Sequence, residues 1–402
     1  MSLEQSEGRR KPDLFPVAPS SRSPHVTYLD RIDPLHEIEF KDVVGTRWDE
    51  ISVLEHALAV SPSGALVHRT KATPSPVSLS AARLYNPLTI RSVAALNQFH
   101  QLSTFQLITL SGGDHKNMEY VLGQLYSAGL IQRSTNTKWT HADKDDRLNF
   151  GVGDVWQLNS TSPRLAEWFD GLSDLEYLLM SGGQNMLKGS NGSSGSSSIR
   201  HNLTLAEIII RAIEMCPGVI GGWGEPLTVV GSFTDTLPDI RKNIADGAIV
   251  GKDGSVILIE TSGAANLDRD AVGKRLSEKA LAWAAVAART EIPLKVVFVN
   301  ISTKARMQRF GHHIQQGLDR INEEIVKPQA QRKGRESIFI ADALDWFPFT
   351  LGISRGFTEL EAYSTVTRRY HSLIPADTKI NPEADVVANT LAALHIPPWI
   401  AH

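Results

Sequence analysis

The sequence predicts a mixed protein, part α+β and part α/β, in two folded domains, and three observations support this prediction. A run of glycine and serine, GSNGSSGSSS (189–198), interrupts the chain near its middle and has the composition of a flexible linker. Before this linker, three helix patterns come directly before two strand patterns. After it, the order is one helix, three strands, one helix and one strand, which is typical of a sheet covered by helices.

Composition restricts the class of protein. A chain of 402 residues is long enough for two or three domains, each with its own core. The net charge of -3 gives no general attraction to nucleic acid or to anionic membranes, so such binding would need a local basic surface. The single cysteine, Cys216, excludes an internal disulfide framework and fits a reducing cytosol. No apolar run is long enough to span a bilayer and the first residues lack an apolar signal core, so we expect a cytoplasmic protein without a membrane partner.

The chain begins with a poorly defined N-terminal region, residues 1–80. Its first part is rich in proline, serine and arginine, a composition that does not favour a fixed fold. Short apolar segments then alternate with proline and serine, so any fixed structure here is expected to come from packing on a later domain.

Residues 81–180 are expected to form the first domain. Each of its three helices has a capping residue at its start. These residues are, in chain order, Thr89, then Ser103 or Thr104, then Asp114. The third helix has an apolar stripe at helical spacing, which consists of Met118, Val121, Leu122 and Leu125. Two strands are expected after the helices, at 130–134 and 155–159, with a polar segment between them.

Three helices followed by a two-stranded ribbon is the order of a winged helix-turn-helix domain, whose third helix fits the major groove of DNA. The exposed face of that helix and the ribbon, or wing, are expected to contact DNA. The expected contacts are His115, Lys116, Asn117 and Tyr120 on the helix, and Arg133, Lys138 and Arg147 on the wing. The wing also carries three aspartates that repel phosphate, so a module used only for protein contacts or dimerisation is the alternative.

The Gly/Ser linker, 181–200, is expected to separate this domain from a second one, 201–345. The second domain begins with a helix capped at Asn202 or Thr204. Its expected strands lie at 226–233, 248–251, 256–260 and 294–300, with a long helix at 270–290. This αβββαβ order is that of the restriction-endonuclease-like core, known by its PD-(D/E)XK motif. Residues 346–402 are expected to form a C-terminal helical tail, in which a helix at 359–373 covers the sheet or mediates dimerisation.

Two carboxylates stand at matched ends of the expected hairpin 244–263. Asp246 precedes its first strand and Glu260 ends its second, so the two can meet at one edge of the sheet. Hydrolysis of a phosphodiester by such a site needs divalent cations, and Mg²⁺ binds carboxylate oxygens while keeping several waters. Glu207 on the preceding helix is the candidate third ligand, with Glu225 in reserve.

The lysine of the PD-(D/E)XK motif is missing. The motif has Glu-x-Lys, whereas this chain has Glu260-Thr261-Ser262. Ser262 can donate a hydrogen bond but brings no positive charge. A lysine of the following helix, Lys274 or Lys279, is the alternative source, and Lys274 completes the expected catalytic set. Two interpretations of the acids therefore stay open: acids derived from a metal site, or structural acids of a turn and a strand end.

Several short motifs resemble those of the plasmid replication-relaxation family. They are HNLTLAEIIIRA (201–212), Trp223-Gly224-Glu225, ADG (245–247) and LIETSG (258–263), together with the preceding winged-helix pattern. The resemblance implies a winged-helix DNA-binding domain fused to a nuclease-like fold, on plasmids and other mobile elements of mainly Gram-positive hosts, with a role in plasmid replication and DNA relaxation. The family signature ends in an acid followed by Asp-Arg-Gly-Thr. Here the corresponding residues after Glu260 are neutral, which argues against catalysis.

The sequence therefore predicts a DNA-binding protein of a plasmid or phage. It is expected to bind duplex DNA sequence-specifically as a homodimer, because winged-helix proteins often bind paired half-sites, and to act in replication or as a transcriptional repressor. No metal or other cofactor is expected, and the chain has no G-x-x-x-x-G-K loop for a nucleotide. The alternative is a Mg²⁺-dependent DNA endonuclease or nickase that uses Asp246 and Glu260. A protein-interaction adaptor is a third possibility.

Overall fold

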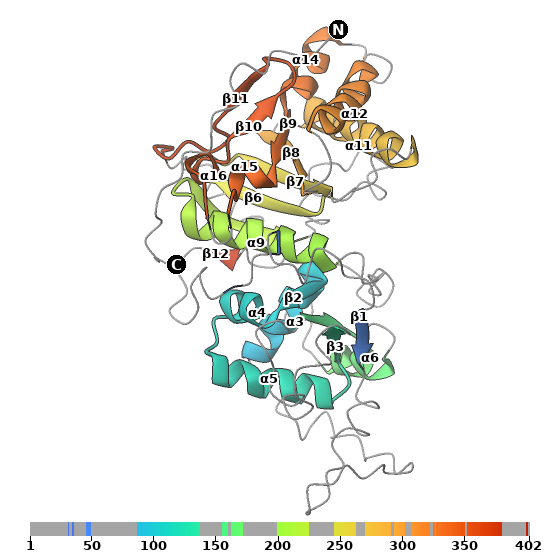
Figure 1. Cartoon of the computed structure of the whole chain (residues 1–402), viewed down its shortest axis with the longest axis vertical. Coiled ribbons are helices and arrows are strands. Elements are labelled where there is room, and N and C mark those ends of the chain that lie inside the picture. The colour runs from blue at the N-terminus through green and yellow to red at the C-terminus, as the bar shows by residue number, and fades with distance from the viewer. Residues whose placement is uncertain are drawn as a thin grey trace, which may run out of the picture. The chain divides into compact units, whose positions relative to one another are not determined.

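A computed structural model describes two compact units of the chain (Figure 1). The described residues are 31, 34–35, 46–49, 87–136, 155–159, 162–171, 199–224, 245–262, 270–290, 293–301, 307–321, 325, 327–349, 352–379 and 399–400. We name the units by the part of the chain that supplies most of each. The N-terminal unit comprises 23–34 and 38–206, and the C-terminal unit comprises 1–22, 35–37 and 207–402. The division falls inside one helix, α9 (Ile199–Met215).

The described part of the N-terminal unit combines helices with an antiparallel sheet. Its helices before α9 are α3 (Pro87–Phe99), α4 (Thr104–Ser111), α5 (His115–Ser127) and α6 (Pro163–Asp170). Its strands are β1 (Thr46–Asp49), β2 (Gln101–Ser103), β3 (Ile131–Asn136) and β4 (Val155–Leu158), paired in the order β1-β3-β4-β2. Because β1 pairs with β3, a short piece of the N-terminal region belongs to this sheet.

Local capping determines where the second and third helices begin, as the sequence predicts. The Ser103 hydroxyl accepts from the Gln106 backbone N–H, and the Gln106 side chain accepts from the Ser103 N–H, which completes a capping box. Asp114 Oδ1 accepts from the Asn117 N–H at 2.7 Å. Gly112 ends α4 at φ 78, a left-handed conformation that favours glycine. The predicted cap at Thr89 is wrong, because α3 begins earlier, at a proline that suits the first turn of a helix.

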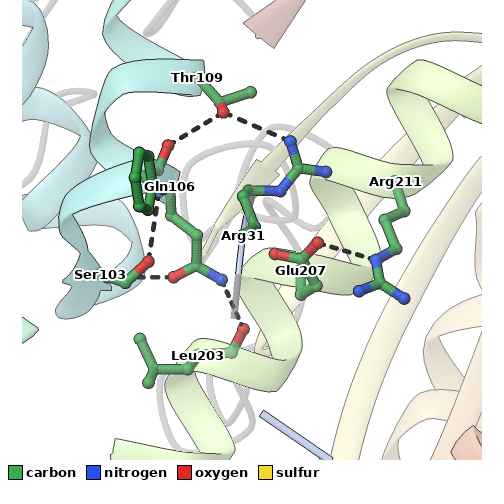
Figure 2. A network of polar contacts seen from close by, with 8 residues as sticks. Arg31, Ser103, Gln106, Thr109, Leu203, Glu207 and Arg211 are labelled. Carbon is green, nitrogen blue, oxygen red and sulfur yellow. Dashed lines mark hydrogen bonds and ion pairs between the residues drawn. The ribbon is translucent and has the colours of Figure 1, made fainter. Parts of the chain in front are cut away.

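Gln106 also connects α4 to the first turns of α9 within the N-terminal unit. Figure 2 shows its amide donating to the Leu203 carbonyl, at 3.0 Å. Beside it, Asn202 donates to the Gln101 side chain, also at 3.0 Å, and both groups are buried. The predicted helix cap at Asn202 or Thr204 is therefore wrong: the helix already begins at Ile199, and the Asn202 amide bonds to a neighbouring strand.

The described part of the C-terminal unit has a mixed sheet with the strand order β11-β10-β9-β8-β7-β6-β5-β12. The strands are β5 (Val219–Gly224), β6 (Gly247–Gly251), β7 (Val256–Ser262), β8 (Leu294–Asn300), β9 (Ile338–Asp342), β10 (Ala362–Ser364), β11 (Arg369–His371) and β12 (Trp399–Ile400). The pairs β7–β8 and β8–β9 are parallel and the others are antiparallel. Its helices after α9 are α11 (Asp270–Arg289), α12 (Met307–Asp319), α14 (Pro328–Glu336), α15 (Ala343–Trp346) and α16 (Arg355–Thr358).

The core of this unit lies where α11 and α12 pack with the central strands. The apolar run LKVVFVN becomes the central parallel strand β8, as its pattern predicts. Glycine lets α11 and α12 approach closely: a Cβ on Gly317 would lie 2.2 Å from the Ser277 carbonyl oxygen. This close approach fixes the position of α11 over the sheet, and α11 supplies two side chains of the candidate site.

Two secondary-structure predictions need correction. In chain order, β5 is the first strand of this sheet. Its sequence, VIGGWG, contains three glycines, which are rare in strands, so the sequence did not predict it. The predicted strand at 226–233 lies outside the described residues. The predicted helix at 359–373 is wrong, because this segment contains the β10–β11 hairpin. The residue pattern of this segment fits a helix or a strand. Tyr363 pairs with Ile340 of β9, so the segment joins the sheet as a strand.

The mixture of helices and sheets that the sequence predicts is confirmed at the level of a mixed α and β chain. In the ranges described above, no helix has both the length and the apolar character needed to cross a membrane.

Candidate functional site

The hairpin β6–β7 brings Asp246 beside the end of β7. Gly247 pairs with Ile259. Asp246, which precedes Gly247, therefore lies next to Glu260 and Thr261, which follow Ile259. Asp246 Oδ2 accepts two hydrogen bonds from Thr261, one from its backbone N–H at 2.7 Å and one from its hydroxyl at 3.0 Å. The two acids predicted to meet at one edge of the sheet therefore do so, and Thr261 fixes the orientation of the first.

Glu260 is buried, with 2 % of its surface exposed, and its carboxylate is held by two residues of α11. Trp283 donates its indole N–H to Oε1 at 2.6 Å, and Lys279 donates to Oε2 at 2.5 Å. Lys279 and Trp283 are four residues apart and so lie on the same face of the helix. A buried carboxylate needs such donors, because burial without partners would cost several kcal/mol.

The electrostatics of this cluster favour protonation. Burial, and then the nearby Asp246 carboxylate, raise the pKa of Glu260 to about 7, although Lys279 and Trp283 act in the opposite direction. Burial lowers the pKa of Lys279, but the Glu260 and Asp246 carboxylates outweigh it, so this pKa lies above its usual value. Both groups therefore hold a proton more tightly than they would in water. A carboxyl with a pKa near neutrality is common at functional sites, although structural ion pairs produce it too.

The structure selects Lys279 rather than Lys274 as the lysine beside the acids. Lys274 is 78 % exposed and lies 3.9 Å from Glu278 on the same helix, so its prediction as the motif lysine is corrected. Ser262 is the last residue of β7, opposite Asn300, and is partly buried. Among the described residues, its hydroxyl forms no hydrogen bond with Glu260 or Asp246.

Glu207 forms a different pair. Its Oε1 accepts from Arg211 Nε at 2.7 Å, and both side chains are buried, as Figure 2 shows. The Arg211 guanidinium also lies over the Phe347 ring, 4.9 Å from its centroid. Within the described residues, no group of three or more histidines, cysteines, aspartates or glutamates is arranged to hold a metal ion. The reserve ligand Glu225 lies outside those residues.

Sequence reasoning missed three members of this edge of the sheet. Trp283 lies on α11, and its place beside Glu260 could have been predicted, because it is four residues from Lys279 on a predicted helix. Asn300 and Asp342 end the parallel strands β8 and β9 at paired positions, and the Asn300 amide lies 3.4 Å from Asp342 Oδ2. Neither residue had a local signal, because only the order of strands in the sheet makes them neighbours.

The candidate nucleic-acid interface is the exposed face of α5, which we call the α5 surface. It consists of His115, Lys116, Asn117 and Tyr120. All four are exposed, Tyr120 with 57 % of its surface, while the predicted apolar stripe of the same helix is buried. The helix is therefore amphipathic in the orientation predicted for it.

The four residues of the α5 surface differ in what holds them. Asn117 donates its side-chain amide to Asp114 at 2.8 Å, and the His115 ring lies 3.5 Å from Glu119. Lys116 and Tyr120 have no side-chain hydrogen bond or ion pair with any residue that the structure describes. These two side chains can reach a ligand without first breaking a hydrogen bond or ion pair to a described residue.

Of the three predicted wing residues, only one is described. Arg133 lies on β3, partly buried, with its guanidinium 6.0 Å from the centre of the Trp156 ring on the paired strand β4. This contact places the charged end of the side chain over a ring of the sheet. Lys138 and Arg147 lie outside the described residues.

Comparison of the chain with protein-family models, with curated proteins and with solved structures found no match. The α5 surface and the acids Asp246 and Glu260 are therefore the features from which a function can be inferred.

Proposed function

We propose that this chain is a DNA-binding protein of a mobile element, which binds duplex DNA sequence-specifically through a winged helix-turn-helix domain. In this proposal α5 is the recognition helix, β3 and β4 flank the wing, and a homodimer reads paired half-sites in plasmid or phage replication or in repression. The short motifs that resemble those of the plasmid replication-relaxation family support the same role. The C-terminal unit would be a nuclease-like domain that adds contacts without cutting DNA.

One observation carries this proposal: α5 presents polar and basic side chains on one face while its other face fills the core. A recognition helix needs this division, because its outer face must enter the major groove while its inner face stays anchored. Lys116 and Tyr120 are exposed and have no side-chain partner among the described residues, which suits a phosphate contact and a base or sugar contact. The nearby Asp114 and Glu119 work against phosphate binding, so affinity must come from shape and from wing residues as well.

Gel shifts on the duplex DNA of the parent element test this function. Lys116→Glu is expected to weaken binding about tenfold or more and to reduce the slope of log affinity against log salt by about 1, as expected for a lost phosphate contact. Lys252→Glu changes the net charge equally but lies in the β6–β7 turn of the other unit. It is the matched control and should bind as wild type. Equal binding by wild type and both variants would reject α5 as the recognition helix.

A second function is favoured by the lysine that the structure supplies. The motif lysine is missing after Glu260 in the sequence. In the structure, Lys279 of α11 donates to Glu260 in its place. Asp246 and Glu260 provide the type and number of carboxylates that suit Mg²⁺, which often binds one or two carboxylates together with waters and substrate phosphates. The bound ion would polarise the phosphate. Lys279 would orient Glu260 and hold a proton next to it. Against this function, Glu260 is buried and already engaged by two donors.

Incubation with supercoiled plasmid and Mg²⁺ separates the two functions. A nickase should lose activity in Asp246→Asn, Glu260→Gln and Lys279→Met. Lys274→Met should keep it, because Lys274 lies on the same helix but is exposed. Metal-dependent nicking that all three buried-site variants abolish would replace the DNA-binding proposal with the nickase. Nicking that none of them affects would come from a contaminant.

A further inference from the structure

The outer edge of the sheet in the C-terminal unit is formed by the β10–β11 hairpin (Figure 1). The turn between the two strands closes with a hydrogen bond from the Arg368 N–H to the Ser364 carbonyl, at 2.9 Å. Residues 366–370 are all exposed, and Tyr370 has 42 % of its surface exposed. The hairpin thus presents a short strand edge whose turn and first β11 residues are exposed.

Two adjacent arginines on this edge have no ion-pair partner among the residues that the structure describes. Arg368 and Arg369 are exposed and form no ion pair with any residue that the structure describes. In contrast, the exposed Arg332 is bound to Glu336 at 2.7 Å. Arg368 also has φ 55, a left-handed conformation that favours glycine or asparagine. Arg368 therefore occupies a turn position where backbone conformation alone would favour another residue.

Two aromatic residues follow these arginines in the sequence, and Tyr370 and Arg369 point to opposite faces of the strand. Tyr370 is directly opposite Tyr363, and their rings meet edge to face with centroids 5.5 Å apart. His371 follows, its ring 6.1 Å from that of Phe339 and its Nε2 2.6 Å from the Thr367 hydroxyl. These contacts fix the orientation of the rings before any ligand binds, which lowers the entropy lost on binding.

We propose that this edge, Arg368, Arg369 and Tyr370, is a binding site for single-stranded nucleic acid. Aromatic faces stack on unpaired bases and arginines contact the backbone phosphates, which is how single strands are bound without sequence preference. A duplex fits less well, because its bases are stacked on one another and only their edges are accessible in the grooves. A second copy of this chain also fits less well, since antiparallel pairing of two β11 edges would bring like charges together.

This site is independent of the function proposed above. It lies in the C-terminal unit, shares no residue with the α5 surface, and lies at the far edge of the sheet from β6 and its acid. A single-strand site would suit any process that opens a duplex, whichever part of the chain reads the duplex.

Fluorescence anisotropy with the full chain and a labelled oligothymidine of about 15 nucleotides tests the proposal. Tyr370→Ala is expected to weaken binding roughly tenfold to a hundredfold, and Tyr370→Phe should stay within about twofold of wild type because it keeps the ring. Arg368→Gly should reduce the slope of log affinity against log salt by about 0.7, the value for one phosphate of a single strand. Its melting temperature should be unchanged or higher, because glycine suits the turn.

The outcomes separate this proposal from the previous one. Oligothymidine binding that Tyr370→Ala and Arg368→Gly both leave unchanged would overturn it, as would a change of oligomeric state in these variants with single-strand binding intact. Lys116→Glu should keep single-strand binding. If wild type binds oligothymidine in a Tyr370-dependent way but binds no duplex, the single-strand site stands and the α5 proposal fails.

Discussion

The α5 surface and the Asp246–Glu260 cluster were predicted by the same kind of reasoning, but they differ in environment. The α5 surface is exposed, and its side chains have few partners. Glu260 is buried and bound by Lys279 and Trp283, and Asp246 is bound by Thr261. A change on α5 should therefore affect binding and leave stability nearly intact, whereas a change in the cluster should first affect stability.

This difference determines how each region can be tested. Loss of function after a substitution at Glu260 is informative only when the folded protein is shown to persist, because buried ion pairs are costly to break. Loss of binding after a substitution at Lys116 can be interpreted directly.

Lys279→Met is expected to have the largest effect, lowering the free energy of unfolding by about 3 kcal/mol or more at neutral pH. It leaves the buried Glu260 carboxyl with the Trp283 indole as its remaining donor from α11. Urea denaturation measures the change. Lys274→Met on the same helix is the control and should stay within about 0.5 kcal/mol of wild type, because that lysine is exposed. Equal effects of the two substitutions would show that the cluster contributes little to stability.

Glu260 should make the stability of the protein depend on pH. Its pKa is about 7 in the folded protein, above its ordinary value of 4.5, so the folded state binds the extra proton between these values. Its contribution is therefore complete at lower pH and is lost as the pH rises through about 7, by up to about 3 kcal/mol. Glu260→Gln cannot titrate, so its stability should change less across this window. If wild type and Glu260→Gln change equally in free energy of unfolding between about pH 5 and about pH 8, the raised pKa of Glu260 is contradicted.

Gly317→Ala tests how firmly α11 is held. The added Cβ would lie 2.2 Å from the Ser277 carbonyl oxygen, so the two helices must separate, at a cost of about 2 kcal/mol. Gly311→Ala on the same helix is the matched control, because its Cβ would meet Ile340 at an ordinary 3.5 Å. The control should stabilise the helix by about 0.5 kcal/mol or more. A Gly317→Ala variant that melts as high as Gly311→Ala would show that α11 and α12 leave room for this Cβ.

Substitutions of Asp114, at the start of α5, test the exposed α5 region and are expected to have the smallest effect. Asp114→Ala removes the α5 cap and should cost about 1 kcal/mol. Asp114→Asn keeps an equivalent cap, so its stability should stay close to wild type while its duplex affinity rises a few-fold through loss of a negative charge near phosphate. Thermal melts and gel shifts on the same samples measure both effects. Weaker duplex binding by Asp114→Asn would argue against phosphate near the start of α5.

Local signals determined the elements that depend on neighbours in sequence. The caps at Ser103 and Asp114, the buried stripe of α5 and the strand β8 all follow from hydrogen bonds or periodicity within a few residues. The meeting of Asp246 with the end of β7 was also predictable, because a short turn fixes the register of a hairpin. The sequence by itself thus determined the helices around α5 and the pairing of the two acids.

Tertiary structure decided what lies around those elements. Only the packing of α11 on the sheet selects Lys279 over Lys274, since both lie on one helix and differ in the face they occupy. Only the strand order makes neighbours of Asn300 and Asp342. The β10–β11 hairpin forms because β9 offers an edge to pair with, although its own residues resemble a helix pattern. Such contacts join residues far apart in the chain, so no periodicity within a single segment can encode them.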